Sequence, residues 1–424
     1  MSYEKKLMQM KGLVKKKSSE ELPKKEVPSI ALPFYTEKWI DAGLKLIRND
    51  RGFLFVKESF YEDEHIHGNI GLGKLQESID FMQQKYPNHP LAINPDIPFC
   101  FYDTETTGLK GAGVFIFLNG MLRKVERGFL LTQYVLADPS QEASFLLATK
   151  FWEKSQTIIT YNGKSFDFPQ LISRWTMNRN AIPPLKDHVQ IDLMHSSKRI
   201  WKGDINRFKL KQVEEMKLGF SRKNDIPGHL APIIYFDAVK HGDPTNLMKV
   251  LKHNEWDILS LVTLYILSVE TLRKKETVES AITYTNIGKW FRDLKTMDAS
   301  IDWFQFVIDQ FDEKEVSLAY YFVGLHLKRQ KLVDNSIQAF QESLKGIGGK
   351  YRLEVYIELA KLYEHQKRDY ERALKMLQEY AEYLQTLKLE REQLLLKELD
   401  KRKMRIFRKL NISRESAQPN KNRL

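Results

Sequence analysis

Apolar positions along the chain change their spacing near residue 277, and this change predicts two kinds of structure. Before this point, short apolar runs of strand length alternate with patterns of helical period. They predict strands at 97–102, 114–118, 121 onward, 129–136, 157–161 and 189–193, and helices at 142–154, 168–178, 209–218 and 247–272. Asn119-Gly120 falls between two of the runs and predicts a type I′ hairpin turn. A meander of three strands followed by alternating helix and strand is typical of an α/β layer fold with a mixed sheet.

After residue 277 the strand signals disappear and a degenerate repeat begins. A shift of 36 residues brings three pairs into register: Gly288 with Gly324, Ser300 with Ser336, and Phe304 with Phe340. A third copy begins at Leu359 and has one extra residue before Ala373. Small residues where helices cross, with aromatic residues elsewhere, are typical of stacked helix pairs. The segment resembles tetratricopeptide repeats, and an ordinary helical bundle is the alternative.

The charge of the chain is uneven along its length. Lys and Arg number 67 against 55 Asp and Glu, and the net charge of +12 favours a polyanionic partner such as nucleic acid, although basic tails also aid solubility. We expect five regions: a basic, flexible arm at 1–30, a region of unknown role at 31–94, the α/β domain at 95–272, helical repeats at 273–385, and a basic helix with a disordered tail at 386–424.

Cysteine content and hydropathy exclude several classes of protein. Cys100 is the only cysteine, so neither an intrachain disulfide nor a zinc site of several thiolates can form. No run of about 18 apolar residues is present, and the first 30 residues lack the apolar core of a signal peptide, so we expect a cytoplasmic protein without a membrane span. His65 and His67 lie two residues apart, and we interpret them as an incidental surface pair.

Two carboxylates follow the first predicted strand. Asp103 and Glu105, in the segment DTETTGL, are two residues apart, so strand geometry places both side chains on one face. Adjacent carboxylates repel each other unless protons or cations intervene, and the pair therefore predicts a site for hard divalent ions. A solvated turn would explain the pair equally well.

Two later segments supply further candidate ligands. Asn162 follows the strand predicted at 157–161, and Asp167 precedes an amphipathic helix, where an N-cap is an equally good explanation. His253 and Asp257 are four residues apart in KHNEWDILSLVTLYI and project from one helical face. A surface pair would give the same spacing.

Taken together, the three segments resemble the motifs of the DEDD exonuclease superfamily, whose domains have an RNase H-like fold. Asp-x-Glu followed by TTGL is similar to the first motif, and Asn162-x3-Phe166-Asp167 is similar to the second motif of family B DNA polymerase proofreading domains. The third motif reads His253-x3-Asp257, which combines the spacing of the tyrosine subclass with the residue type of the histidine subclass. With helical repeats after this domain, the chain resembles the YprB family of bacterial predicted exonucleases.

The resemblance implies hydrolysis of phosphodiester bonds with two Mg²⁺ or Mn²⁺ ions. It puts Asp103 between both ions, Glu105 and Asp257 on one ion, and Asp167 on the other through water. The role of His253 stays open, because it can take the proton of the attacking water or only orient that water.

The same resemblance implies a substrate and a setting. It assigns substrate contacts to Thr107, Leu109 and Asn162, favours DNA over RNA, and implies a 3′–5′ exonuclease in DNA repair, with a helicase or another protein on the repeats. A ribonuclease is one alternative, and an interaction protein with a vestigial nuclease domain is another; the presence of all four acids favours an active enzyme. We interpret a fifth acid, Asp192, as structural. A basic stretch follows it and can either contact phosphates and bases or form a solvated face; it comprises Lys198, Arg199, Trp201 and 209–211.

Overall fold

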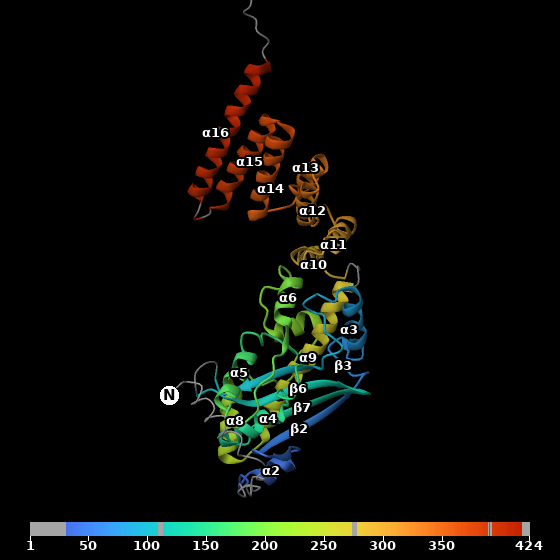
Figure 1. Ribbon diagram of the computed structural model, residues 1–424, viewed down its shortest axis with the longest axis vertical. Coiled ribbons are helices and arrows are strands. Elements are labelled where there is room, and N and C mark those ends of the chain that lie inside the picture. Colours follow the sequence, from blue (N-terminus) through green and yellow to red (C-terminus); the bar gives the residue numbers. More distant parts are fainter. Residues whose placement is uncertain (1–30, 109–112, 274–277, 389, 391, 418–424) are drawn as a thin grey trace, which may run out of the picture.

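The computed structural model describes residues 31–108, 113–273, 278–388, 390 and 392–417, so the predicted N-terminal arm and the end of the predicted tail lie outside the described residues. An α/β part and an all-helical part follow one another along the long axis of the molecule (Figure 1). Within the described ranges, no helix combines the length and the apolar character needed to cross a membrane.

The α/β part is built on one mixed sheet. The strands of this part, including the separate short pair β3 and β4, are β1 (Lys45–Asn49), β2 (Gly52–Glu62), β3 (Ile66–His67), β4 (Ile70–Gly71), β5 (Phe99–Thr106), β6 (Ile116–Val125), β7 (Gly128–Val135), β8 (Thr157–Thr160) and β9 (Val189–Asp192). The sheet has the order β1-β2-β7-β6-β5-β8-β9. Strands β5, β6 and β7 form an antiparallel meander, whereas β8 and β9 run parallel to β5. The predicted fold class, an RNase H-like α/β fold followed by an all-helical region, is confirmed.

Helices cover both faces of this sheet. They are α2 (Thr36–Asp41), α3 (Lys74–Lys85), α4 (Glu142–Ala148), α5 (Asp167–Met177), α6 (Leu193–Trp201), α7 (Leu210–Val213), α8 (Ala231–His241) and α9 (Thr245–Arg273), with short turns η1 (Pro139–Gln141), η2 (Glu214–Leu218) and η3 (Gly228–Leu230). Successive residues of β5 point to opposite faces, so Phe101 packs against Tyr265 of α9 while Tyr102 packs against Phe151. The helix predicted at 142–154 is shorter than expected and ends at Ala148.

The hairpin predicted at Asn119-Gly120 is wrong, because β6 runs straight through both residues and the chain turns later, between β6 and β7. Asn119 is buried, and its Oδ1 accepts a hydrogen bond from the Tyr102 hydroxyl at 2.6 Å. A Cβ on Gly120 would lie 2.2 Å from Asn254 Oδ1 of α9. The glycine therefore allows α9 to approach the sheet closely and does not form a turn.

Residues 31–94 contribute to the same sheet. Strand β2 pairs with β7, and Phe55 lies opposite Val135. The first five residues of β2 are all buried, whereas its second half alternates between exposed and partly buried positions. One strand thus combines two patterns, which explains why no single hydrophobic period runs through this region.

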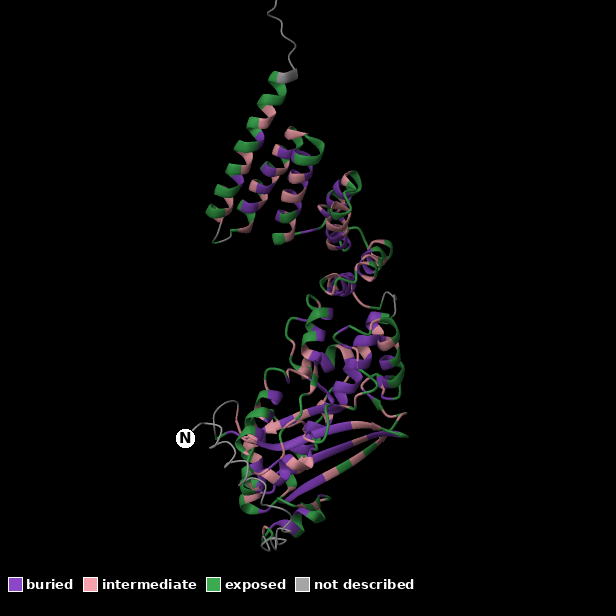
Figure 2. Ribbon diagram, in the orientation of Figure 1, coloured by how far each residue is buried: buried purple, intermediate pink, exposed green. Residues whose placement is uncertain are grey.

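The second part of the chain consists of helices that pack in successive pairs. They are α10 (Ala281–Asp293), α11 (Met297–Gln310), α12 (Ser317–Arg329), α13 (Val333–Ser343), α14 (Gly349–Leu362), η4 (Tyr363–Lys367), α15 (Tyr370–Leu387) and α16 (Glu392–Ala417). Figure 2 shows buried residues concentrated in the sheet and along the sides of helices that face one another. Ser300 Oγ donates a hydrogen bond to the Gly288 carbonyl at 2.8 Å, and Ser336 Oγ donates one to the Gly324 carbonyl at 2.9 Å. The aligned serines and glycines of the sequence therefore make the same contact in two successive helix pairs.

Candidate metal centre

Strand β5 carries Asp103 and Glu105 toward α9. Both side chains are partly buried and share the face of Phe101, which α9 covers. Asn254 of α9 donates a hydrogen bond from Nδ2 to Asp103 Oδ2 at 2.8 Å and accepts one at Oδ1 from Gln133 Nε2 at 2.8 Å. This buried chain of amides fixes one oxygen of Asp103 between the sheet and the helix.

Helix α9 brings His253 and Asp257 to the same place. Glu105, His253 and Asp257 each offer one ligand atom, and these three atoms lie within 4.8 Å of one another. His253 Nε2 is 3.5 Å from Asp257 Oδ2 and 4.0 Å from Glu105 Oε1. Residues that are about 150 positions apart in the sequence therefore form a possible carboxylate and histidine metal site. Spacing on strand and helix predicts only the shared face within each pair, and the resemblance implied that the pairs meet.

The acids of this cluster are short of positive charge. Burial raises the pKa of Asp103 well above its ordinary value, and the neighbouring charges of Asp257 and Asp167 raise it further. The pKa of Glu105 is raised well above its ordinary value by the same causes in the same order. Carboxylates that resist ionisation together take up either protons or a cation, and oxygen donors with one imidazole suit a hard divalent ion. The residues present therefore fit a divalent metal.

Asp167 lies apart from this group. It is the first residue of α5, it is 4% exposed, and it accepts a hydrogen bond from the Thr104 hydroxyl, on the opposite face of β5 from Glu105. Burial raises its pKa to about 6, although the hydrogen bond from Thr104 acts in the other direction. The alternative explanation as an N-cap is wrong, because the N-cap of α5 is Phe166 and makes no capping bond. Asp167 influences the cluster here through its charge.

The remaining candidates lie in the turns around the cluster. Thr107 Oγ1 accepts a hydrogen bond from the Phe115 backbone at 3.0 Å, and Leu109 lies outside the described residues. Asn162 has a positive φ of 64°, and its backbone N–H donates to Asp192 Oδ1 at 2.8 Å. Asp192 also accepts a hydrogen bond from the N–H of Met194 at 3.0 Å, so it holds a turn and begins α6, in keeping with a structural role. Substrate contacts at Thr107, Leu109 and Asn162 stay predictions.

A segment that the sequence patterns did not single out, 219–228, also reaches the cluster. The guanidinium of Arg222 is 2% exposed and makes two hydrogen bonds to the fully buried carboxylate of Glu214, from Nε at 2.8 Å and from Nη2 at 2.6 Å. Nη2 also donates to Asp257 Oδ1. Arg222 thus supplies one positive charge to a group that holds several carboxylates, and it fixes one oxygen of Asp257.

Asp225 of the same segment holds the histidine. Its Oδ1 lies 2.6 Å from His253 Nδ1, and Arg222 Nη1 lies 3.3 Å from the same ring nitrogen. A carboxylate at Nδ1 favours a proton on that nitrogen, which leaves Nε2 facing Glu105 and Asp257. Asp225 is 28 residues before His253, and no periodic pattern links a polar loop to a helix over that separation.

We expected His65 and His67 to form an incidental surface pair, but His67 is buried and supports this segment. His67 is buried, its Nε2 lies 2.8 Å from Ser260 Oγ, and its ring lies 4.0 Å from that of Phe220. Burial lowers the pKa of His67 to about 3, so the ring is neutral at physiological pH. His67 packs under the 219–228 segment and stabilises its position.

A cleft of about 500 Å³ opens onto the cluster. The acids and the histidine occupy one wall, and the 219–228 segment and α7 form the others; its lining residues are Asp103, Tyr161, Leu210, Lys211, Arg222, Asp225, Ile226, Pro227, Gly228, His253 and Asp257. Lys211 borders this cleft, as a contact for phosphate would. For Trp201 both predicted alternatives, a base contact and a solvated face, are wrong, because that indole is fully buried and its Nε1 donates to Glu279 at 3.1 Å.

Comparison with known proteins agrees with this arrangement. Residues 100–269, which include the whole cluster, match the model of the RNase_H superfamily. The chain is also 33% identical over 387 residues to YprB of Bacillus subtilis strain 168, an uncharacterized protein, and the match covers 89% of this chain and 93% of YprB.

Proposed function

The chain belongs to the same family as YprB and contains an RNase_H superfamily domain, and from that premise we propose that it is a 3′–5′ exonuclease that degrades DNA with divalent metal ions. The observation that carries the proposal is the partly buried cluster of Asp103, Glu105, Asp257 and His253 at the end of β5, which has too little positive charge of its own. The excess of basic residues along the chain agrees with a polyanionic substrate.

In this proposal the four acids Asp103, Glu105, Asp167 and Asp257 would hold two Mg²⁺ or Mn²⁺ ions. Bound divalent ions supply an activated water and stabilise the negative charge that develops on the phosphate. Asp167 accepts a hydrogen bond from Thr104 on the opposite face of β5, and its negative charge adds to that which a cation near Asp103 would balance. Asn254 and Arg222 keep Asp103 and Asp257 in place for this task.

His253 takes the proton of the attacking water in this mechanism. Asp225 at Nδ1 keeps Nε2 directed at the acids and stabilises the imidazolium that forms when Nε2 accepts a proton. A tyrosine at this position could orient water but would not accept its proton at neutral pH, so the Asp225–His253 pair supports general-base catalysis.

Digestion of end-labelled nucleic acids tests the proposal. Single-stranded DNA, duplex DNA and RNA, each labelled at the 5′ or at the 3′ end, are incubated with the full chain and Mg²⁺ or Mn²⁺. A 3′–5′ exonuclease releases the 3′ label at once as a mononucleotide and shortens the 5′-labelled strand stepwise. Degradation of RNA alone would identify a ribonuclease, and an intact set of substrates would favour an interaction protein with a vestigial domain.

The helical part gives the proposed enzyme a second surface. The recurring glycine and serine contacts of α10–α13 support a tetratricopeptide-like arrangement, in which stacked helix pairs present one extended face. A repair setting, with a helicase or another protein as partner, is part of the proposal and rests on resemblance alone.

A further inference from the structure

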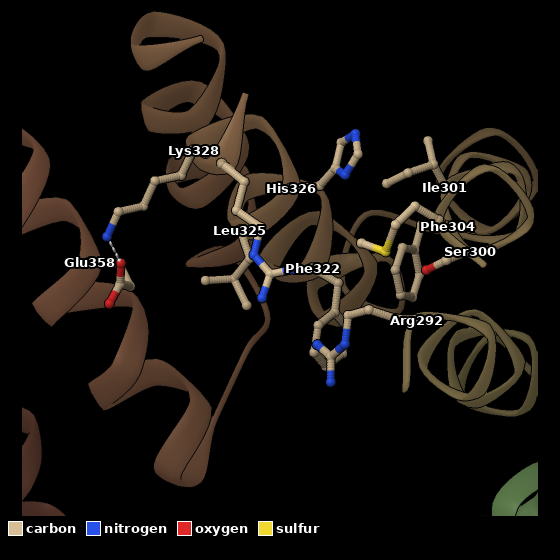
Figure 3. A pocket seen from close by; sticks show the side chains of 11 residues that line it. Arg292, Ser300, Ile301, Phe304, Phe322, Leu325, His326, Lys328 and Glu358 are labelled. Carbon is tan, nitrogen blue, oxygen red and sulfur yellow. Dashed lines mark hydrogen bonds and ion pairs between the residues drawn. The ribbon is translucent and has the colours of Figure 1, made fainter. Parts of the chain in front are cut away.

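Two adjoining pockets lie in the helical part, far along the chain from the metal cluster. The first, which we call the aromatic pocket, has a volume of about 330 Å³, and Figure 3 shows its side chains. The second, which we call the basic pocket, has a volume of about 560 Å³. Lys328 of α12 lines both, so the two pockets adjoin, and their lining comes from α10–α14, η4 and α16.

The aromatic pocket combines an aromatic floor with cations. Phe304 and Phe322 stack at 5.3 Å between ring centroids, and the guanidinium of Arg292 lies 4.4 Å from the Phe322 centroid (Figure 3). Arg329 is a further cation of the lining. The one carboxylate there, Glu358, already pairs with Lys328 and with Lys361. Planar guanidinium and aromatic groups of this kind stack on nucleic-acid bases.

The basic pocket is lined by cations without a carboxylate among them. Its cations are Lys328, Lys331, Lys361, Arg402 and Arg405. Lys328 and Lys361 pair with Glu358, and Arg405 pairs with the buried Glu364. Within the described part of the chain, Lys331 and Arg402 have no ion pair, and Nη1 of Arg402 is buried without a hydrogen-bond partner. Lys331 and Arg402 therefore leave positive charge at this pocket that no carboxylate of its lining balances.

Helix dipoles alone do not explain these cations. Lys328 and Lys361 occupy the last turns of α12 and α14, where positive side chains complement the helix dipole. Arg402 and Arg405, however, lie in the middle of the 26-residue helix α16. The helix dipole therefore accounts for Lys328 and Lys361 but not for the two arginines that α16 brings to the same place.

We propose that the two adjoining pockets bind a single strand of nucleic acid, with phosphates in the basic pocket and a base on the aromatic pocket. This inference rests on the proposed nuclease function, because that function makes the bound strand the substrate of the metal cluster. An acidic peptide would also satisfy the cations, but it would leave the outer face of the Arg292 guanidinium, whose inner face covers Phe322, without a planar partner. The helical part would then hold the strand that the metal cluster shortens.

A binding measurement in excess EDTA, which prevents hydrolysis, tests this with fluorescein-labelled oligothymidylate and the full chain. Replacing two lining residues together, Lys331→Gln and Arg402→Gln, should weaken binding by about 10–30-fold and reduce the slope of log affinity against log salt by about 1.4, at about 0.7 per lost cation. The matched control, Lys375→Gln with Lys397→Gln, removes the same charge from exposed positions outside both pockets and should bind as the wild type does.

Two further readouts separate this inference from the nuclease proposal. Cleavage of a thymidine p-nitrophenyl phosphate diester with Mn²⁺, which reaches only the metal cluster, should be unchanged in the pocket variant. Loss of strand binding in a chain that cleaves no phosphodiester would support the pockets and refute the nuclease proposal. Equal affinity and salt slope in the pocket variant and its control would overturn the pocket assignment. It would also be overturned if oligoglutamate displaced the strand as efficiently as unlabelled DNA does.

Discussion

His253 Nδ1 lies 2.6 Å from Asp225 Oδ1, and this contact joins the helix that carries two of the candidate ligands to a loop that no motif identified. The carboxylate determines which ring nitrogen carries the proton and which way the other nitrogen points. The role of His253 therefore depends on Asp225, and substitution of each residue tests its part separately.

Replacing the orienting carboxylate should slow turnover without weakening substrate binding. Asp225→Asn removes the charge that stabilises a protonated His253, and we expect kcat to fall by about 10–100-fold with little change in KM. Steady-state cleavage of single-stranded DNA with Mn²⁺ measures both constants. Asp237→Asn, at an exposed acid of α8, is the control and should behave as the wild type does. An unchanged kcat in Asp225→Asn would mean that the pair does not assist catalysis.

Replacing the histidine distinguishes a general base from an orienting group. If His253 accepts the proton of the attacking water, His253→Ala should lose about 10²–10⁴ in rate, and His253→Tyr should not recover it. Retention of most activity by His253→Tyr would show that the residue only orients water, as the tyrosine spacing of the motif allows. A fully active His253→Ala protein would remove this residue from the site.

The fold could be predicted from the sequence where one period runs through a whole element. The pairs Asp103–Glu105 and His253–Asp257 were predicted to share a face because strand and helix spacing depend only on neighbours along the chain. The role of Gly120 was not predictable in this way, because Asn-Gly favours a turn locally and only the approach of α9 requires a glycine there. Tertiary packing decided between the two.

The part of the site that could not be predicted lies in the 219–228 segment. Arg222 and Asp225 belong to a polar, glycine- and proline-containing stretch that is typical of a loop, and their partners are 35 and 28 residues away. Arg222 of this loop reaches Asp257 only because the chain folds, and no local sequence pattern predicts that contact. Asp167 was assigned to the group by resemblance, and its carboxylate accepts a hydrogen bond from Thr104 on the opposite face of β5 from Glu105.

Arg222 should be essential for stability as well as for the geometry of the site. Arg222→Met leaves the buried Glu214 without its partner and should lower the free energy of unfolding by about 3–5 kcal/mol. Arg222→Met with Glu214→Gln removes the uncompensated charge and should recover most of that loss, while activity stays low because Asp257 has lost its contact. Urea unfolding in EDTA measures the stability of both variants. Equal stability of the single and double variants would contradict this account of the ion pair.

The raised pKa of Asp167 predicts a pH-dependent gain in stability on its removal. Folding raises this pKa to about 6, so the unfolded chain loses the proton at lower pH than the folded chain does. The stability that the protonated carboxyl contributes is therefore complete below its ordinary pKa and is lost as pH rises through about 6. In EDTA, Asp167→Asn should match the wild type near pH ~4 and exceed it by roughly 1–3 kcal/mol near pH ~8. The same difference at both pH values would contradict the assignment.

The dependence of nucleic-acid cleavage on both metal and acids tests the central claim most directly. The release of mononucleotides from 3′-labelled single-stranded DNA is measured for the wild type and for Asp103→Ala, Glu105→Ala, Asp167→Ala and Asp257→Ala, with Asp237→Ala as the control, in Mn²⁺ and in excess EDTA. We predict that EDTA abolishes release, that each of the four variants stays folded and loses at least about 10²-fold in rate, and that the control keeps the wild-type rate. Release at the wild-type rate in EDTA, or by a folded Asp103→Ala protein, would contradict the account.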